Sequence, residues 1–149
     1  MSAVDISSIT EVEKGKEQYM IEFTIMLPPI SKKNSQQIMV NRATGKPFIM
    51  PSKQFKEYER AAFLQIPKIQ EPIGCPCNVR CLFYMPTHRK CDLTNMLEAI
   101  DDIMVRAGLL ADDNFTIIES HDGSRVLYDK ENPRTEVQIV TIKNGIIRL

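Results

Sequence analysis

The sequence lacks any long run of apolar residues. A helix needs about 20 consecutive apolar residues to cross a bilayer, and no stretch of the 149 residues provides them. The first 18 residues also lack the basic start and the apolar centre of a secretory signal. The chain is therefore predicted to be cytoplasmic, with no membrane among its partners.

Several signatures of catalytic and binding sites are also missing. The sequence has no glycine-rich phosphate loop, and its serines have no convincing histidine and aspartate partners for nucleophilic catalysis. Its four cysteines follow the spacing C-x-C-x3-C-x9-C, which matches no common zinc pattern. We interpret them as reduced cysteines that serve as small apolar residues. His121, at the end of a predicted strand, is expected to make a structural hydrogen bond.

The net charge is zero, but the charges are unevenly distributed along the chain. Residues 28–60 contain seven basic and two acidic residues, whereas residues 92–119 contain seven acidic residues and one basic residue. A basic half and an acidic half in one small domain suggest two tasks, holding an anion and holding a cation.

The patterns predict one small domain of the α/β (α+β) class, with a mixed sheet and two main helices. Residues 1–18 are polar and show no periodicity, so we predict a flexible tail followed by a folded domain at 19–149. Ser52 is predicted to cap the first helix, and Gly108 to end the second. The predicted strands lie at 19–27, 36–40, 47–51, 77–85, 115–121, 124–128 and 135–142, and the helices at 52–65 and 92–107.

The second predicted helix carries the most informative pattern. Its apolar residues fall within one sector when the chain advances 100° per residue. Asp101 lies outside both this sector and the opposite polar stripe, and is expected on the solvated surface. The polar stripe consists of Asp92, Asn95, Glu98 and Asp102.

Two interpretations of this polar stripe stay open. It is either a solvated helix face with Asp92 as the N-cap, or part of a site for a hard divalent cation. The acids at 98 and 102 repel each other at i,i+4 spacing, and no base is expected to relieve them. Asp112 and Asp113 add two more carboxylates, the ligands that Mg²⁺ prefers. Such an ion would activate water to cut a phosphodiester, while the basic segment would hold the phosphate backbone.

These residues resemble the signature of the RusA-type Holliday junction resolvases, small dimeric nucleases often carried by phages and prophages. The resemblance rests on "HRKCDLTN", "RAGLLADD" and the upstream "IMLPPISKKN", and extends over about residues 20–142. It implies a Mg²⁺-dependent endodeoxyribonuclease, with Mn²⁺ as a substitute. The enzyme would bind branched DNA as a homodimer and resolve four-way junctions by paired phosphodiester cuts.

The resemblance also implies roles for individual residues. Thr94 stands where the family has a second aspartate, and Glu98 stands where it has a catalytic lysine. We interpret Glu98 as a relocated metal ligand; the alternative is a catalytically inactive junction-binding phage accessory protein. The predicted catalytic residues are Asp92, Asn95, Glu98 and Asp113, and the predicted metal ligands are Asp92, Glu98, Asp112 and Asp113. The predicted DNA contacts are Lys32, Lys33, Arg42, Lys46, Arg89 and Lys90.

The length of the second helix sets a geometric constraint on this site. As a helix, residues 92–107 would span about 24 Å, and the return from Gly108 to Asp113 covers at most about 20 Å even when fully extended. Asp92 and Asp113 therefore meet in one subunit only if the helix begins late or the return is straight. Otherwise the partner subunit is expected to complete the site.

Overall fold

The structure, a computed structural model, describes residues 10–11, 17–32 and 36–142. Lys33, one of the predicted DNA contacts, lies outside these ranges, as does most of the predicted tail. The strands are β1 (Thr10–Glu11), β2 (Glu17–Gln18), β3 (Met20–Ile25), β4 (Gln36–Val40), β5 (Pro47–Pro51), β6 (Cys77–Met85), β7 (Ile118–Ser120), β8 (Arg125–Tyr128) and β9 (Arg134–Thr141), and the helices are α1 (Lys53–Phe63) and α2 (Leu93–Arg106).

The main sheet is built around β6 and β9. Strand β9 lies between β3 and β6 and is antiparallel to both, whereas β7 and β8 pair with β6 in parallel. Strand β7 pairs with the beginning of β6 and β8 with its end. Strands β1 and β2 pair with each other, and β4 and β5 form a separate hairpin. The predicted mixed sheet with two helices is confirmed.

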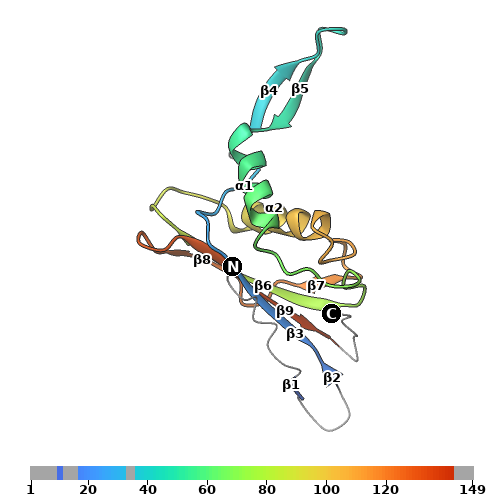
Figure 1. Ribbon diagram of the computed structural model, residues 1–149. Coiled ribbons are helices and arrows are strands. Elements are labelled where there is room, and N and C mark those ends of the chain that lie inside the picture. Colours follow the sequence, from blue (N-terminus) through green and yellow to red (C-terminus); the bar gives the residue numbers. More distant parts are fainter. Residues whose placement is uncertain (1–9, 12–16, 33–35, 143–149) are drawn as a thin grey trace.

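Both helices lie on the same side of the main sheet (Figure 1). The core fills the space between the helices and the sheet. Strand β6 alternates buried and half-buried residues, because successive side chains of a strand point to opposite faces. The buried set of β6 faces the apolar sector of α2, which includes Met96, Ile100, Ile103 and Met104. None of the described helices is long and apolar enough to span a bilayer.

The cysteines behave as the sequence predicts. All four are free, and Cys77 and Cys81 are buried in β6. Burial raises the pKa of the Cys77 thiol to about 12 and also raises that of Cys81. Such thiols stay protonated at neutral pH and serve as small apolar side chains.

The predicted helix ends are also confirmed. Ser52 caps α1, and its hydroxyl oxygen accepts a hydrogen bond of 3.1 Å from the amide of Phe55. Gly108 follows α2 with a φ of 79°, a conformation that favours glycine. The strand predicted at 115–121 is shorter in the structure, because Asn114 closes a turn by accepting the amides of Ile117 and Ile118.

The burial of α2 leads to a test of the core. Ile103 is fully buried, so Ile103→Ala should lower the free energy of unfolding by about 2–5 kcal/mol, through lost burial and a cavity. Urea unfolding measures the change. Leu64, which is 88% exposed, is the control, and Leu64→Ala should change the same quantity by less than ~0.5 kcal/mol. Equal effects of the two substitutions would contradict the position of α2 on the sheet.

Candidate functional site

The first predicted site residues meet at the beginning of α2. Asp92 is the N-cap in backbone conformation, and its carbonyl accepts the amide of Met96 at 3.2 Å. Its side chain makes no capping hydrogen bond and instead accepts a 3.2 Å hydrogen bond from the side-chain amide of Asn95. Asn95 thus orients the Asp92 carboxylate, which does not cap the N-terminus of α2.

The second acidic segment is positioned by the chain that returns from α2. Leu109 and Leu110 are buried in the core, and Leu110 forms a parallel bridge with Ile73. The amide of Ala111 then donates to the carbonyl of Ile73 at 3.0 Å. These contacts fix the backbone immediately before Asp112, although the following acidic turn is itself exposed.

Asp112 and Asp113 perturb each other. The Asp112 carboxylate accepts the amide of Asp113 at 2.7 Å, and this backbone hydrogen bond is the main cause that lowers the pKa of Asp112. Desolvation, followed by the hydrogen bond and negative charge of Asp112, raises the pKa of Asp113. The charge of Asp102 raises it further. A nearby cation would favour the charged form of both carboxylates and so relieve their mutual repulsion.

The stripe on α2 contains cations that the sequence interpretation did not expect. Lys32 Nζ lies 2.6 Å from Asp102 Oδ2, and Arg106 Nε lies 3.5 Å from the same oxygen. Arg106 also reaches Glu59 of α1 at 3.2 Å. The expectation that no base relieves these acids is wrong, because Arg106 follows Asp102 by one helical turn and Lys32 approaches from another segment.

Lys32 is therefore held by the protein on two sides. Besides its ion pair with Asp102, its ammonium group lies 5.8 Å from the centre of the Phe55 ring. A lysine in this position brings positive charge to the acidic side of α2. Its predicted role as a DNA contact stays a prediction.

The expectation for Asp101 is also wrong. The residue is buried, and its Oδ2 lies 2.8 Å from Nε2 of His121. At 100° per residue Asp101 falls only about 40° from Leu97, at the border of the apolar sector. That proximity was the available signal for its burial. The predicted structural hydrogen bond of His121 is confirmed.

The pair formed by Asp101 and His121 holds a proton. Nδ1 of His121 must donate to the carbonyl of Val79 at 2.7 Å, because a carbonyl only accepts. Nε2 then meets Asp101 favourably only if a proton lies between them. Desolvation opposes the charged imidazole, but the hydrogen bond and charge of Asp101 outweigh it and raise the pKa of His121. The pKa of Asp101 is raised as well, in this case by desolvation, which outweighs the opposing effect of His121.

The remaining predicted DNA contacts lie on two exposed turns. Arg89 and Lys90 belong to the turn that leads directly into Asp92, and the ring of His88 in this turn stacks on Tyr128 at 3.8 Å. Arg42 and Lys46 lie in the turn of the β4–β5 hairpin. Glu98 is exposed on α2, one helical turn before Asp102.

One protomer does not bring the predicted metal ligands into a single cluster. Within the described ranges, no group of three or more His, Cys, Asp or Glu residues is close enough to hold a metal ion. Asp113 is electrostatically coupled to Asp101 and Asp102, which follow Asp92 by nine and ten residues, or about 14–15 Å of helix. Asp92 and Asp113 are thus associated with opposite ends of α2.

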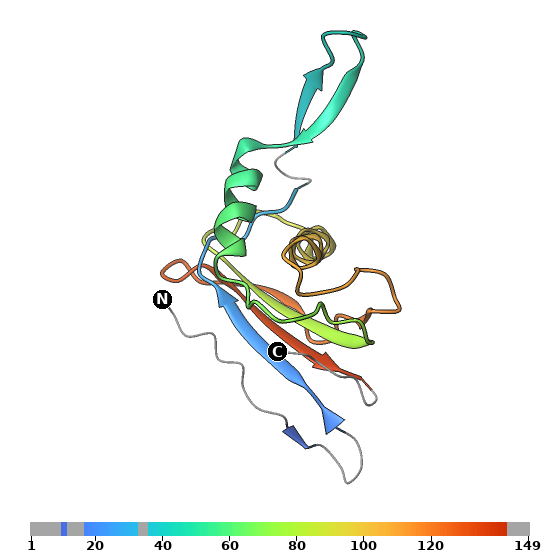
Figure 2. The ribbon, with the colours of Figure 1, turned by 45° about the vertical axis from the view of Figure 1, so that its right-hand side comes forward.

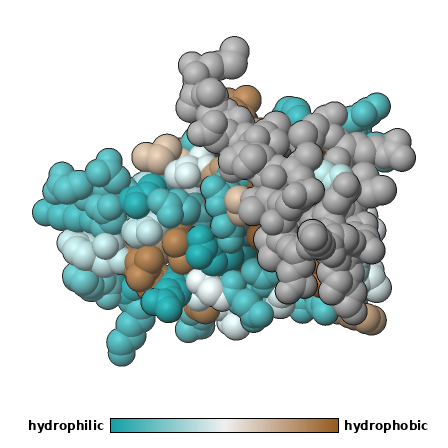
Figure 3. Space-filling model, turned by 90° about the horizontal axis from the view of Figure 1, so that it is seen from below, coloured by the Kyte–Doolittle hydropathy of each residue, from teal (hydrophilic) through white to brown (hydrophobic). Residues whose placement is uncertain are grey.

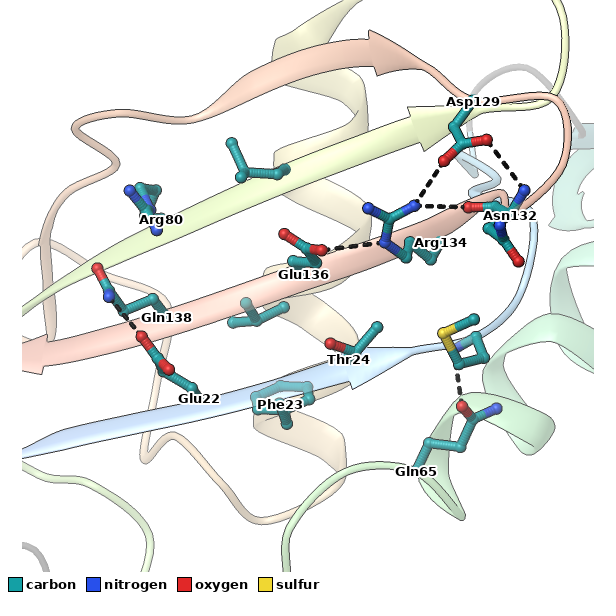
Figure 4. Close-up of a pocket in the computed structure, with 13 residues that line it drawn as sticks. Glu22, Phe23, Thr24, Gln65, Arg80, Asp129, Asn132, Arg134, Glu136 and Gln138 are labelled. Carbon is teal, nitrogen blue, oxygen red and sulfur yellow. Dashed lines mark hydrogen bonds and ion pairs between the residues drawn. The ribbon is translucent and has the colours of Figure 1, made fainter. Parts of the chain in front are cut away.

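A hollow lies elsewhere in the fold. It has a volume of about 720 Å³ and is lined mainly by residues of β3, β6 and β9, with none of the predicted site residues among its lining (Figure 4). Arg134 is paired there with Asp129 at 2.9 Å and with Glu136 at 3.0 Å. Seen from below, the described part of the molecular surface is mainly hydrophilic (Figure 3). The paired charges of the hollow leave no excess of positive charge to attract a nucleic acid.

The proton held by Asp101 and His121 leads to a test. The pKa of His121 should lie above the unfolded value of about 6.5, and Asp101→Asn should lower it, since the substitution removes the charge that raises it. Nuclear magnetic resonance titration of the imidazole measures both values, and His88→Gln identifies the signals of the only other histidine.

The same shift predicts how stability depends on pH. Because the folded-state pKa of His121 is raised, its stabilisation is complete below pH ~6.5 and is lost as the pH rises through the folded value. A His121 pKa that is unchanged in Asp101→Asn would contradict the shared proton.

A comparison with protein families identifies the family to which this sequence belongs. The family model described as "Endodeoxyribonuclease RusA" matches residues 27–140, a range that includes both acidic segments and the hairpin. Comparison with curated proteins gives no match. Nucleases of the matched family depend in general on divalent metals. Because the match covers well over half of the sequence, the chain belongs to the RusA family of endodeoxyribonucleases, hydrolases that resolve Holliday junctions.

Proposed function

We propose that this protein is an active, Mg²⁺-dependent endonuclease that cuts four-way DNA junctions as a homodimer. The observation that carries the proposal is the family match, which spans the Asp92–Asn95 pair and the Asp112–Asp113 turn together. A second observation supports the proposal: Asn95 orients the Asp92 carboxylate, which does not cap the helix.

The proposed ligands are carboxylates that stay accessible. Asp92, Glu98, Asp112 and Asp113 are all exposed, which suits oxygen ligands that must meet both a cation and DNA. A bound Mg²⁺ or Mn²⁺ ion would lower the pKa of a water molecule and stabilise the charge of the phosphodiester as it is cut. Asn95 would hold the Asp92 carboxylate in position, as a positioning residue.

The basic residues would bind the phosphates around this site. Arg89 and Lys90 precede Asp92 by three and two residues in the sequence, so they would contact the DNA strand nearest the reacting phosphate. Arg42, Lys46 and Lys33 would neutralise phosphates further away. Lys32, already placed on the acidic side of α2 by Asp102, would supply positive charge that the glutamate at position 98 does not.

The separation of the acids favours a site shared between protomers. Asp92 lies at the beginning of α2, and Asp113 is coupled to acids near the end of the same helix. An antiparallel arrangement of two α2 helices about a two-fold axis would bring Asp92 of one protomer towards Asp113 of its partner. Two such sites per dimer would account for paired cuts in opposite strands.

Cleavage of a synthetic four-way junction tests the proposed activity. With Mg²⁺ or Mn²⁺, the protein should nick the junction, and Asp92→Asn should lower the rate by at least ~100-fold, since several kcal/mol of transition-state stabilisation depend on the metal. The rate is measured under single-turnover conditions. Asp122→Asn changes an exposed aspartate outside the site and should leave the rate unchanged.

The same assay distinguishes the alternative, a junction-binding protein without activity. Thr94 and Glu98 replace an aspartate and a lysine of the family pattern, and this departure is the observation that favours the alternative. Tight junction binding with no cleavage in either metal would support it and would overturn the proposed enzyme.

Mixed dimers test the shared site. Asp92→Asn and Asp113→Asn homodimers should both be inactive, whereas a mixture that exchanges protomers should regain nicking, because one of its two shared sites is intact. A site contained within one protomer would stay inactive in the mixture. The readout is nicking of a supercoiled cruciform plasmid, because a single nick requires only one active site.

A further inference from the structure

The β4–β5 hairpin, which we call the arm (residues 36–51), stands apart from the rest of the protein. It extends from the beginning of α1, away from the sheet (Figures 1 and 2). Its strands pair with each other and join no other described strand. An isolated two-stranded hairpin is at best marginally stable in water, so the arm is expected to need a further contact.

Both faces of the arm are apolar. The register pairs Ile38 with Ile49 and Met39 with Phe48, and cross-strand partners share a face. Ile38 is 77% exposed and Ile49 is 65% exposed, whereas Met39 and Phe48 are 45% and 42% exposed. Of the nine large exposed apolar residues among the described ranges, five lie on the arm. Such a concentration marks a binding surface.

The strands of the arm and its turn differ in charge. Its strands contain no charged residue, and its turn carries Arg42 and Lys46 without any acid. Strands that bind DNA along their length need cations and hydrogen-bond donors, because most contacts go to phosphates. The aliphatic strands therefore suit a protein surface, while the turn suits DNA.

The area of the arm indicates which protein it contacts. Five paired residues form a ribbon about 17 Å long and about 10 Å wide, so its two faces offer about 340 Å² together. One arm on an unrelated protein would bury only about 700 Å² in total, below the roughly 1,200 Å² of a stable specific interface. Two arms exchanged across a two-fold axis would bury about 1,400 Å², which falls within that class.

We propose that the occupant of the arm's apolar strands is a second copy of this chain. This inference rests on the proposed homodimer and adds to it the element that makes the contact. Each protomer packs both apolar faces of its arm, the Ile38–Ile49 face and the Met39–Phe48 face, against its partner. Arg42 and Lys46 are thereby carried onto the partner's half of the DNA, so each half of the junction is held partly by cations of the other protomer.

Oligomeric state without DNA tests the contact. Sedimentation velocity should show a dimer for the unchanged protein, and Ile38→Glu combined with Ile49→Glu should weaken dimerisation by at least ~100-fold, because two charges would be buried without partners. Ile38→Thr combined with Ile49→Thr keeps β-branched residues that favour strands and should weaken it less. Leu64→Glu places one glutamate on a residue off the arm that is more exposed, at 88%, than Ile38 or Ile49, and should leave the dimer intact.

Two further outcomes are decisive. Arg42→Ala combined with Lys46→Ala should leave the dimer intact but reduce the salt dependence of junction affinity by up to about two counterions. A monomer at ~100 µM, or a dimer unaffected by the paired glutamates, would overturn the arm contact. Failure of the proposed function is seen separately, as absence of junction cleavage by the unchanged protein.

Discussion

The packing of one face of α2 against β6 fixes the position of every acidic group on its other face. Met96, Ile100, Ile103 and Met104 are buried against the sheet, so the helix cannot rotate without exposing them. Rotation by even one residue step, 100°, would exchange the buried and polar sectors. The acidic stripe is therefore as rigid as the core that supports it, which suits groups that must meet a cation and a phosphate in fixed geometry.

The uneven charge along the sequence becomes a set of local pairings in the fold. Lys32, from the basic segment, pairs with Asp102, and Glu59 of α1 pairs with Arg106 of α2. These contacts link α1, α2 and the segment after β3 around the acidic side of the molecule. Their contribution to stability is modest because the groups are partly exposed. Their larger effect is to lower the negative potential to which a phosphate backbone must bind.

The periodic elements could be predicted from the sequence, because their patterns reflect burial directly. Local chemistry was enough to predict the hairpin at 36–51, the N-cap of α1 at Ser52 and the glycine that follows α2, Gly108. Contacts between distant segments could not be predicted in this way. The approach of Lys32 to Asp102 and the burial of Asp101 against His121 depend on how loops cross the sheet. The separation of the two acidic motifs, by contrast, could be anticipated, because the length of the predicted helix places Asp92 and Asp113 towards its opposite ends.

The isolation of the arm has a consequence for the energetics of the whole chain. Because its strands share no sheet with the core, the arm can open and close by local unfolding while the core stays folded. Its amide protons are then expected to exchange with solvent far faster than those of β6 and β9. If dimerisation orders the arm, the protection of its amides from exchange would rise with protein concentration. The protection of the core would not depend on protein concentration.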